Sequence, residues 1–589
     1  MDSLLTSLSQ LSINSNLEFI GYDPHHGSVP QMNKSHNDWF FACRALVVST
    51  ICMYAFFFNL QTVQRVLYDY RRPHPTPEKA EEFFLRYDVN KHQILKDEHY
   101  WKALLIVTEW FRPRWKIHPV HFTDLRWYPW NKNTSAERPF TTEPFYKTYV
   151  QYWFKQNWLL DGKLSFRNLE NHIWLRIRPM LHRIKRGLTV AIPPITLHVK
   201  PALVFDIVDK VRTVFGVSKL VIFIEAMFFW PLFSHYFTIC KTPLLWNYES
   251  LNGGWHRLNA EYRSRYTSFK PVFNLDWSEY DMHIYFDMWK DCFDSVSSYF
   301  CFCGCYCPTN PGVAQGSGYP KPRTKPEYIF NLWKWIWTAY TSMLCISPTG
   351  KVFKRLFAGM PSGIFCTQFW DSFYNCVMVV TILLSLGYEI HPDHFLKVMG
   401  DDVLFGLLTM IPISEWAEFL DAFADEAKRR FNMKLSPSKC GASETIQGAS
   451  VLSYSNNNGW PVRDPETLLA QLLNPKSLKD TFPRLMARAI GIYYASAGSP
   501  KLRPICKHIY DELKHQGFEP HHRVIYEMFG HLPETVSFIS LDHFPSEVEV
   551  LSRISRPSGR SDELQSQYWN REHFIFESGL APHCDEMTN

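Results

Sequence analysis

The chain has 589 residues, of which 46% are hydrophobic and 16% aromatic, and its formal net charge is +5 at pH 7. This length and apolar content exclude a disordered chain and allow a large core divided among several subdomains. The mild positive charge permits a nucleic-acid partner, which a local channel would have to recognise. There is no internal repeat, low-complexity tract, P-loop or Rossmann glycine pattern, which argues against an ATP-driven helicase.

The first predicted element is an uncharged apolar run from Ala45 to Phe58. Its fourteen residues are fewer than the roughly 20 that a membrane-spanning helix needs. We therefore expect a buried helix, continuous from His36 to Tyr70, and no membrane association.

Three cations, Lys210, Arg212 and Lys219, occur within ten residues of an otherwise apolar neighbourhood. They could bind the phosphates of a nucleoside triphosphate, and arginine is suited to bidentate phosphate contact, which favours Arg212. The alternative is that all three are solvent-facing positions on a strand.

A short apolar run from Pro271 to Leu275 predicts a buried strand, and Asp276 follows it directly. A carboxylate at the end of a core strand is a candidate metal ligand. Asp281 lies five residues later, too far along the chain to join the same metal site easily. It could instead bind near the 2′-OH of a ribonucleotide, or cap a helix.

Four of the fourteen cysteines alternate along one segment from Cys301 to Cys307. This spacing differs from the C-x₂-C pairs of zinc sites, and no matching distal Cys/His pair is evident. We expect this segment to belong to an insertion, with a metal site as the less favoured alternative. The thiols are expected to be reduced in a cytosolic setting.

A stretch with two glycines and a proline, Ala358 to Gly363, predicts a loop that leads into a long buried helix. Within that helix, Thr367, Asp371 and Asn375 recur at four-residue steps. Such a stripe lies on one side of a helix and indicates that this side faces something polar.

Gly400, Asp401 and Asp402 separate two short apolar runs, a pattern typical of a β-hairpin with two carboxylates at its tip. Two-metal phosphoryl transfer requires carboxylates that hold divalent ions roughly 3.5–4 Å apart. We therefore expect Asp276 to complete a metal site with Asp401 and Asp402. The alternative for the tripeptide alone is an exposed polar turn.

The remaining pattern predicts a helix, a strand pair, a set of helices and an exposed polar tail. These elements cover, in order, Ser414 to Phe431, Gly441 to Tyr454, Pro461 to Phe544, and Ser552 to Gln567.

Together these motifs resemble the RNA-directed RNA polymerases of partitivirus-like double-stranded RNA viruses. Asp276 to Asp281 resembles motif A of that family, Gly359 to Asn375 resembles motif B, and Gly400 to Asp402 resembles motif C. Their order and spacing also agree, and Lys210 to Lys219 resembles the basic motif F.

The resemblance implies an α+β fold of right-hand polymerase type, with an antiparallel-sheet palm and mostly helical fingers and thumb. The expected subdomains are an N-terminal extension bridging fingers and thumb (1–120), fingers with motif F (121–270), palm with motif A (271–299), a fingers insertion (300–350), palm with motifs B to E (351–456), and a helical thumb with a C-terminal tail (457–589).

The resemblance also implies roles for individual residues. Asp276, Asp401 and Asp402 would hold Mg²⁺, with Mn²⁺ as an alternative, and a motif D lysine, Lys439 in preference to Lys434, would protonate the leaving pyrophosphate. The nucleotide would be bound by a larger set: Lys210, Arg212, Lys219, Asp281, Ser362, Gly363, Thr367 and Asn375. In that set, Asn375 would recognise the ribose together with Asp281, and Asp371 would be a structural partner.

The implied activity is RNA synthesis from ribonucleoside triphosphates on an RNA template, which would replicate and transcribe a viral double-stranded RNA genome. Single- and double-stranded RNA and the capsid protein are the expected partners, and the expected location is the virion interior and the host cytoplasm. A reverse transcriptase and a catalytically idle RNA-binding or capsid-associated protein are the alternatives.

Overall fold

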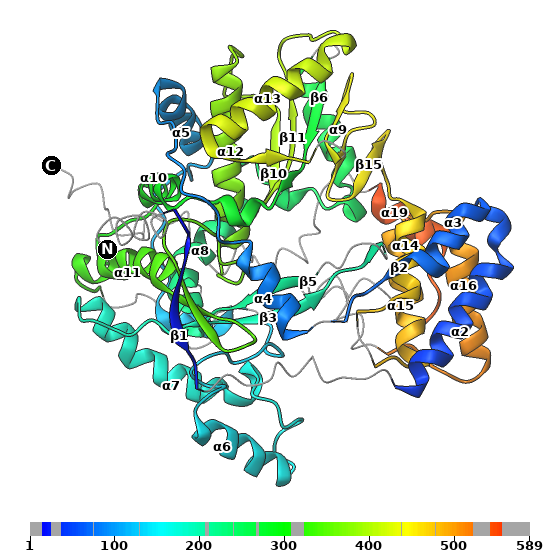
Figure 1. Ribbon diagram of the computed structural model, residues 1–589, viewed down its shortest axis with the longest axis horizontal. Helices are drawn as coiled ribbons and strands as arrows, with labels where there is room; N and C mark the ends of the chain where they lie inside the picture. The colour runs from blue at the N-terminus through cyan, green and yellow to red at the C-terminus, as the bar shows by residue number, and fades with distance from the viewer. Residues whose placement is uncertain are drawn as a thin grey trace, which may run out of the picture.

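The structure is a computed structural model that describes the following residues: 14–24, 37–74, 76–128, 130–205, 211–238, 241–266, 270–307, 323–436, 439–476, 479–521 and 542–555. They form many helices and several β-sheets, in agreement with the predicted α+β class (Figure 1). The predicted polar tail lies outside the described residues from residue 556 onward.

A four-stranded antiparallel sheet joins the segments that carry the predicted carboxylates. Its strands, in spatial order, are β10 (Leu396–Met399), β11 (Asp402–Gly406), β6 (Val272–Leu275) and β13 (Gly441–Ser443). Successive side chains of a strand point to opposite faces. Accordingly, Phe273 and Phe405 belong to one hydrophobic core and Val272 and Leu404 to another.

Helices cover both faces of this sheet, which explains why most side chains of β6, β10 and β11 are apolar. On one face lie α12 (Thr367–Ser385) and α13 (Trp416–Phe431), and the ring of Phe419 in α13 lies 4.6 Å from that of Phe273. On the other face, α9 (Gly254–Arg265) contributes Trp255 and Leu258 to the second core. The carboxylates at the strand ends therefore rest on a rigid, doubly covered layer.

A five-stranded sheet lies below the first in Figure 1. Its strands, in spatial order, are β1 (Leu17–Tyr22), β9 (Lys351–Arg355), β8 (Leu344–Ile346), β3 (Ile195–Pro201) and β5 (Val211–Gly216). Most of the helices of the largest core lie around this sheet and α12: α4 (Pro77–Leu85), α5 (Glu98–Trp110), α6 (Pro144–Lys155), α7 (Phe166–Lys185), α8 (Lys219–Thr238), α10 (Phe286–Ser297) and α11 (Pro326–Ser342).

A separate core joins the C-terminal helices to a helix from the start of the chain. The C-terminal helices are α14 (Pro465–Leu473), α15 (Phe482–Ala495), α16 (Arg503–His515) and α19 (Glu547–Ile554). Val47 and Ile51 of α2 (Asp38–Met53) are fully buried in the same core. These helices gather on the right of Figure 1, beside a small sheet of β14 (Ser450–Val451), β15 (Tyr454–Asn457) and β16 (Trp460–Val462).

The single helix predicted from His36 to Tyr70 is broken. After α2 the chain forms a 3₁₀ turn, the short helix α3 (Leu60–Gln64) and a π-helical turn. The first helix ends at Met53, with Tyr54 as its C-cap, and the extended backbone of Phe58 and Asn59 separates the turn from the next helix. The Asn59 side chain accepts the N–H of Thr62 at 2.6 Å and so begins α3. The apolar run is also only partly buried, since Phe56 is 74% exposed.

The chain then returns toward the five-stranded sheet through β2 (Tyr70–Arg71), which pairs with β4 (Val204–Phe205). Among the described residues, one helical stretch, Lys219–Phe237, is long and apolar enough to cross a membrane. It lies in the largest core, with 94% of its apolar window buried inside the protein.

Candidate active site

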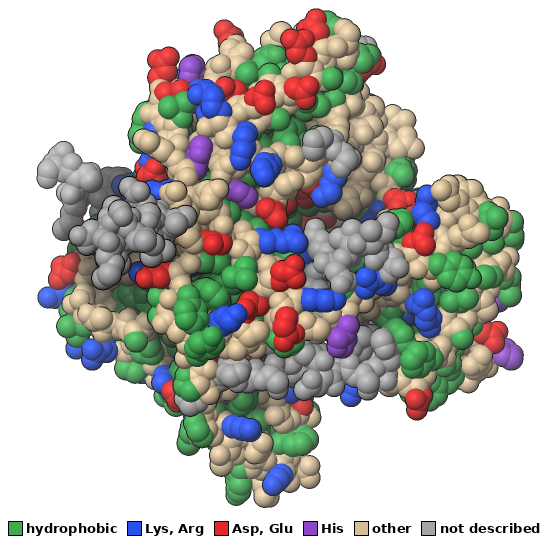
Figure 2. Space-filling view, viewed as in Figure 1, with side chains coloured by type: hydrophobic (Ala, Val, Ile, Leu, Met, Phe, Trp, Pro, Cys, Tyr) green, Lys and Arg blue, Asp and Glu red, His purple; other side chains and the backbone are tan. Residues whose placement is uncertain are grey.

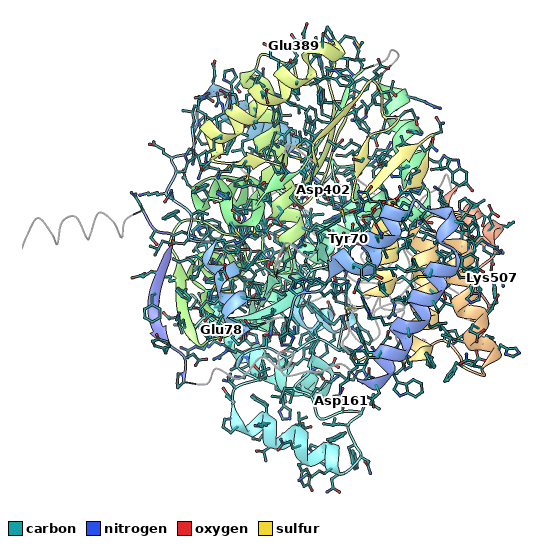
Figure 3. All side chains as sticks on the ribbon, turned by 45° about the vertical axis from the view of Figure 1, so that its right-hand side comes forward. Tyr70, Glu78, Asp161, Glu389, Asp402 and Lys507 are labelled. Atoms are coloured by element: carbon teal, nitrogen blue, oxygen red, sulfur yellow. The ribbon has the colours of Figure 1, made fainter. Side chains whose placement is uncertain are left out.

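The Gly400–Asp402 segment forms the tight hairpin turn that the sequence predicts. Met399 pairs with Asp402, so Gly400 and Asp401 are the two turn residues. Gly400 has a φ of 68°, and a positive φ at the first turn residue is what a type II′ hairpin turn requires of glycine. The turn presents Asp401 to solvent at the tip, near the centre of the molecule, where Asp402 is labelled in Figure 3.

Helix α12 supports this hairpin through hydrogen bonds. The Ser372 hydroxyl accepts the Gly400 N–H at 2.8 Å, and the Asn375 amide donates to the carbonyls of Gly400 and Asp401 at 2.9 and 3.1 Å. The indole N–H of Trp277 donates to the other end of the Asn375 amide at 3.0 Å. Of the predicted polar stripe, Asn375 faces the backbone of the hairpin, together with the neighbouring Ser372.

Asp276 reaches the hairpin by strand register. Val403 pairs with Leu275, so the next residues along the two strands, Asp402 and Asp276, come opposite each other. The Lys439 ammonium lies 2.9 Å from Asp276 Oδ1, and the Ser436 N–H donates to the Asp276 carbonyl at 2.8 Å. The structure thus brings together the four residues predicted to be catalytic.

The negative charges of these carboxylates repel one another. Burial, together with the charges of Asp401 and Asp276, raises the pKa of Asp402 to about 7. Although Asp401 is exposed at the tip, the surrounding protein removes part of its water, and this desolvation and the charge of Asp276 raise its pKa, while the charges of Arg212 and Lys439 oppose the rise. In Figure 2, acidic and basic side chains gather at the centre of this face. Three convergent carboxylates with incomplete charge compensation have the donor set of a site for a hard divalent cation.

Asp281 and Asp371 form a second acidic pair next to the first group. Asp281 lies in the 3₁₀ turn Tyr280–His283, and burial and the Asp401 charge raise its pKa to about 7. Asp371 is buried, and burial and the charge of Asp281 raise its pKa well above the usual range. Its Oδ1 is buried and accepts no hydrogen bond from the described residues.

The loop before α12 is fixed by backbone contacts. A Cβ on Gly363 would lie 1.8 Å from the Phe215 carbonyl oxygen of β5, so only glycine fits between the loop and this strand. Ser362 is exposed beside it. The Thr367 hydroxyl donates to the Ile364 carbonyl at 3.0 Å, within the first turn of the helix.

Two buried residues that the sequence analysis did not single out as functional hold the same loop. Asn16, from the start of the chain, uses its whole amide: it accepts the N–H groups of Phe357 and Ala358 at 2.9 Å each and donates to the carbonyls of Tyr87 and Ala358 at 2.7 and 3.1 Å. No local pattern marks an asparagine for such a role, because all its partners are distant in sequence.

Glu225 of α8 is the second residue of this kind. Its carboxylate accepts the N–H groups of Phe365 and Cys366 at 3.0 and 3.4 Å and the Tyr340 hydroxyl at 2.6 Å. Cys366 is the N-cap of α12 and makes no side-chain cap of its own. Glu225 therefore caps α12 from another helix, and a carboxylate is favoured at that end.

The three predicted phosphate-binding cations differ in position. Arg212 is exposed on β5. Its positive charge opposes the rise in the pKa of both Asp281 and Asp401, so it lies beside the acidic groups. Lys219 is buried at the start of α8, over the ring of Phe166 at 5.8 Å, with Glu137 as its charged neighbour. The structure therefore does not bring Lys219 to the carboxylates. Lys210 lies outside the described residues.

Comparisons with known proteins bear directly on this site. Residues 207–477, which include all five aspartates of this site, match the model of the viral RNA-dependent RNA polymerase family. The chain is 31% identical over 558 residues to the RNA-directed RNA polymerase of White clover cryptic virus 1 (isolate Boccardo/2004), which covers 86% of this chain and 88% of that protein. The chain belongs to the viral RNA-dependent RNA polymerases.

A second relative is the RNA-directed RNA polymerase of Atkinsonella hypoxylon virus (isolate 2H), 27% identical over 500 residues, which covers 75% of this chain and 72% of that protein. The family predicted from the motifs is thus confirmed, and with it the activity of an RNA-directed RNA polymerase that acts on RNA and nucleotides. The family also implies the right-hand polymerase fold and a requirement for divalent metal ions.

Proposed function

We propose that this polymerase replicates and transcribes a viral double-stranded RNA genome by metal-assisted nucleotidyl transfer, with Mg²⁺ as the ion. The proposed catalytic mechanism is supported by one observation: Asp276, Asp401 and Asp402 converge at one end of a rigid sheet, and Lys439 contacts Asp276. These three carboxylates would hold the ions, which when bound supply charge stabilisation for the attacking and leaving oxygens.

The chain's own residues supply the rest of the chemistry. Arg212 is exposed on β5 beside Asp281 and Asp401, where its guanidinium could make a bidentate contact with the triphosphate. Lys439 is 61% exposed and can exchange its contact with Asp276 for the leaving pyrophosphate. It would donate the proton that this group requires as a general acid.

Ribose recognition is better supported at Asp371 than at Asn375. Both ends of the Asn375 amide are engaged by protein groups, and the residue is fully buried. Asp371 has an oxygen without a partner among the described residues and lies beside Asp281. We therefore assign recognition of the 2′-OH to Asp281 and Asp371, and assign to Asn375 the support of the hairpin.

Within the right-hand fold, the four-stranded sheet would be the palm, the five-stranded sheet with its surrounding helices the fingers, and α14 to α16 the thumb. The first 120 residues would bridge fingers and thumb. This proposal is supported by β1, which joins the five-stranded sheet, and α2, which joins the C-terminal helices. Capsid protein as partner, and the virion interior and host cytoplasm as location, are proposed from the family alone.

The test is incorporation of labelled ribonucleotides on a single-stranded RNA template with Mg²⁺ or Mn²⁺. We expect template-length product from the unmodified chain and none from Asp401→Asn, with deoxyribonucleotides used poorly. Equal use of deoxyribonucleotides would favour a reverse transcriptase and remove the role of Asp281. Template binding without synthesis under both metals would favour an idle RNA-binding protein.

A further inference from the structure

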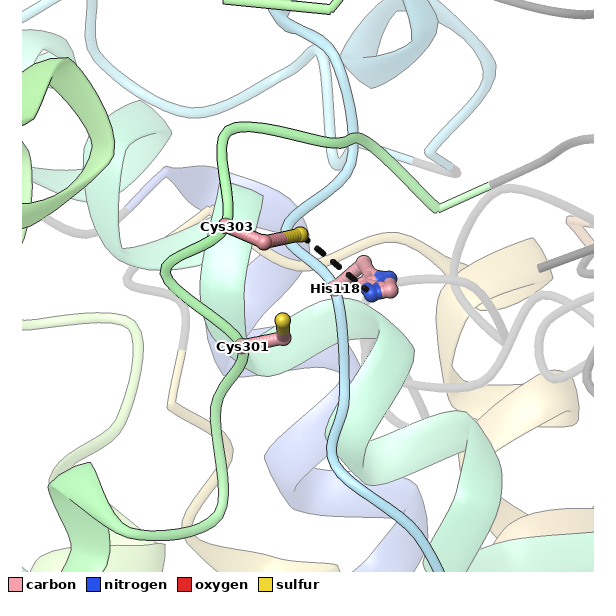
Figure 4. A group of neighbouring side chains, drawn as sticks. All are labelled: His118, Cys301 and Cys303. Carbon is pink, nitrogen blue, oxygen red and sulfur yellow. Dashed lines mark hydrogen bonds between the residues drawn. The ribbon is translucent and has the colours of Figure 1, made fainter. Parts of the chain in front are cut away.

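The cysteine segment that the sequence analysis left without a distal partner has one in the folded chain. His118 lies 185 residues before Cys303, and its Nε2 is 3.9 Å from the Cys303 sulfur. Figure 4 shows these two side chains pointing toward each other, with the Cys301 sulfur beside them. The three ligand atoms all lie within 4.8 Å of one another.

Backbone pairing brings the two segments together. Ile117 forms a parallel bridge with Phe300: the Ile117 N–H donates to the Tyr299 carbonyl at 2.8 Å, and the Cys301 N–H donates back to the Ile117 carbonyl at 2.9 Å. Farther along, the Cys307 N–H donates to the Pro119 carbonyl at 2.8 Å. The position of His118 beside the cysteines therefore follows from ordered main-chain contacts on both sides of it.

The turn after Cys303 is also held in a defined shape. Gly304 has a φ of 89°, and a Cβ at this position would lie 2.0 Å from the Thr324 carbonyl oxygen. The Arg323 guanidinium donates to the Cys303 carbonyl at 3.1 and 2.9 Å, and the Thr324 N–H donates to the Gly304 carbonyl at 2.8 Å. Cys301 and Cys303 are thus presented on one preformed loop.

We propose that His118, Cys301 and Cys303 bind a zinc ion that clamps the 301–307 loop to the segment before Pro119. Two thiolates and one imidazole form a soft donor set that selects Zn²⁺ over the Mg²⁺ of a carboxylate site. Tetrahedral zinc, with Zn–S near 2.3 Å and Zn–N near 2.0 Å, puts ligand atoms about 3.5–3.8 Å apart. The observed separations, 3.9 Å between His118 Nε2 and the Cys303 sulfur and at most 4.8 Å within the group, are within about 1.3 Å of these values.

The environment suits a structural ion. Cys301 is 5% and His118 9% exposed, so the ion would be largely shielded from water. Binding would release the two thiol protons to solvent and leave one coordination position for a water molecule or another donor. Because the clamp is separate from the carboxylates, its loss is expected to lower stability without removing the polymerase metal site.

The experiment measures metal in the full-length protein, purified without chelator, by plasma mass spectrometry. We expect about one zinc per chain in the unmodified protein, and about tenfold less in His118→Gln, Cys301→Ser and Cys303→Ser. The matched control is Cys52→Ser, since Cys52 is exposed on α2. It should keep the zinc content of the unmodified chain.

A second measurement uses the unmodified chain alone, so its result does not depend on whether the substituted chains fold. Metal-free protein titrated with Co²⁺ should develop thiolate-to-cobalt charge-transfer absorption and the strong visible bands of a tetrahedral site, and added Zn²⁺ should abolish both. Absence of the charge-transfer band in the unmodified chain, or equal zinc content in Cys303→Ser, would overturn the proposal.

Discussion

At the scale of single residues, some side chains of the site are available to bind substrate, and others are engaged in supporting the protein itself. Asn375 and Asp371 are one helical turn apart on α12, yet the first is saturated with protein contacts and the second is not. The same distinction applies to the lysines after α13. Lys439 contacts Asp276, whereas Lys434 is exposed on the short strand β12 (Lys434–Leu435).

The first prediction concerns sugar choice. Asp371→Ala should lower the preference for ribonucleotides over deoxyribonucleotides by about 100-fold, because a site built to bind a hydroxyl discriminates through that group. The measurement is kcat/KM for matched rNTP and dNTP pairs. Asn375→Ala is the comparison: it should leave the sugar preference unchanged and lower the free energy of unfolding by about 2 kcal/mol through its lost buried hydrogen bonds. Relaxed sugar choice in Asn375→Ala alone would contradict the assignment.

The second prediction concerns the general acid. Lys439→Met should slow single-turnover nucleotide addition by about 100-fold, since proton donation to the leaving group contributes on that order. Lys434→Met provides a control of identical chemistry and should stay close to the unmodified rate. If the two variants slowed the reaction equally, the proton donor would have to be sought elsewhere.

At the scale of elements, the active site depends on contacts between segments that are distant in sequence. The hairpin rests on α12, α12 is capped by Glu225 of α8, and the loop before it is held by Asn16 and by the Phe215 backbone. The first three links are hydrogen bonds to backbone N–H groups, and the last is a close steric contact with Gly363. Disturbing one link should therefore shift the loop and the hairpin together.

The third prediction follows from the cap. Glu225→Ala leaves two backbone donors and the Tyr340 hydroxyl without their acceptor, so the free energy of unfolding should fall by about 3 kcal/mol. Chemical denaturation measures this loss. Glu109→Ala is the control, because Glu109 forms an exposed ion pair with Arg112 and should change stability by less than about 0.5 kcal/mol.

At the scale of the whole molecule, Glu225 also couples stability to pH. Burial raises its pKa to about 7, although three donors favour its ionised form. A raised folded-state pKa means that the associated stability is present below the unfolded value, near 4.3, and is lost as the pH rises through about 7.

The fourth prediction is that raising the pH from 6 to 8 should lower the free energy of unfolding by about 1 kcal/mol through Glu225. Glu225→Gln has no titrating group at this position. Its free energy of unfolding should therefore fall by about 1 kcal/mol less than that of the unmodified chain between pH 6 and 8. Denaturant midpoints at the two pH values measure the difference. Identical pH dependence in both proteins would show that Glu225 is already ionised at pH 6.

The sequence predicted the parts of the site that depend on local pattern. The hairpin at Gly400, the strand before Asp276 and the loop-to-helix transition at Gly363 follow from glycine positions and alternating apolar residues. The break after Met53 was missed because the apolar run Ala45 to Phe58 continues through it without a glycine or proline. The roles of His118, Asn16 and Glu225 could not be predicted for another reason. Their partners are distant in the chain and meet only in the tertiary fold, and a single sequence contains no signal for such pairs.

The packing of α2 has a consequence for how the chain is made. Its partners, α14 to α16, leave the ribosome after most of the protein has been synthesised, and β1 must likewise wait for β9. The N-terminal segment is therefore translated first but docks last, and pairings of such long sequence separation form slowly. Asn16 belongs to the same segment, so it can support the loop before α12 only after Phe357 and Ala358 have been synthesised.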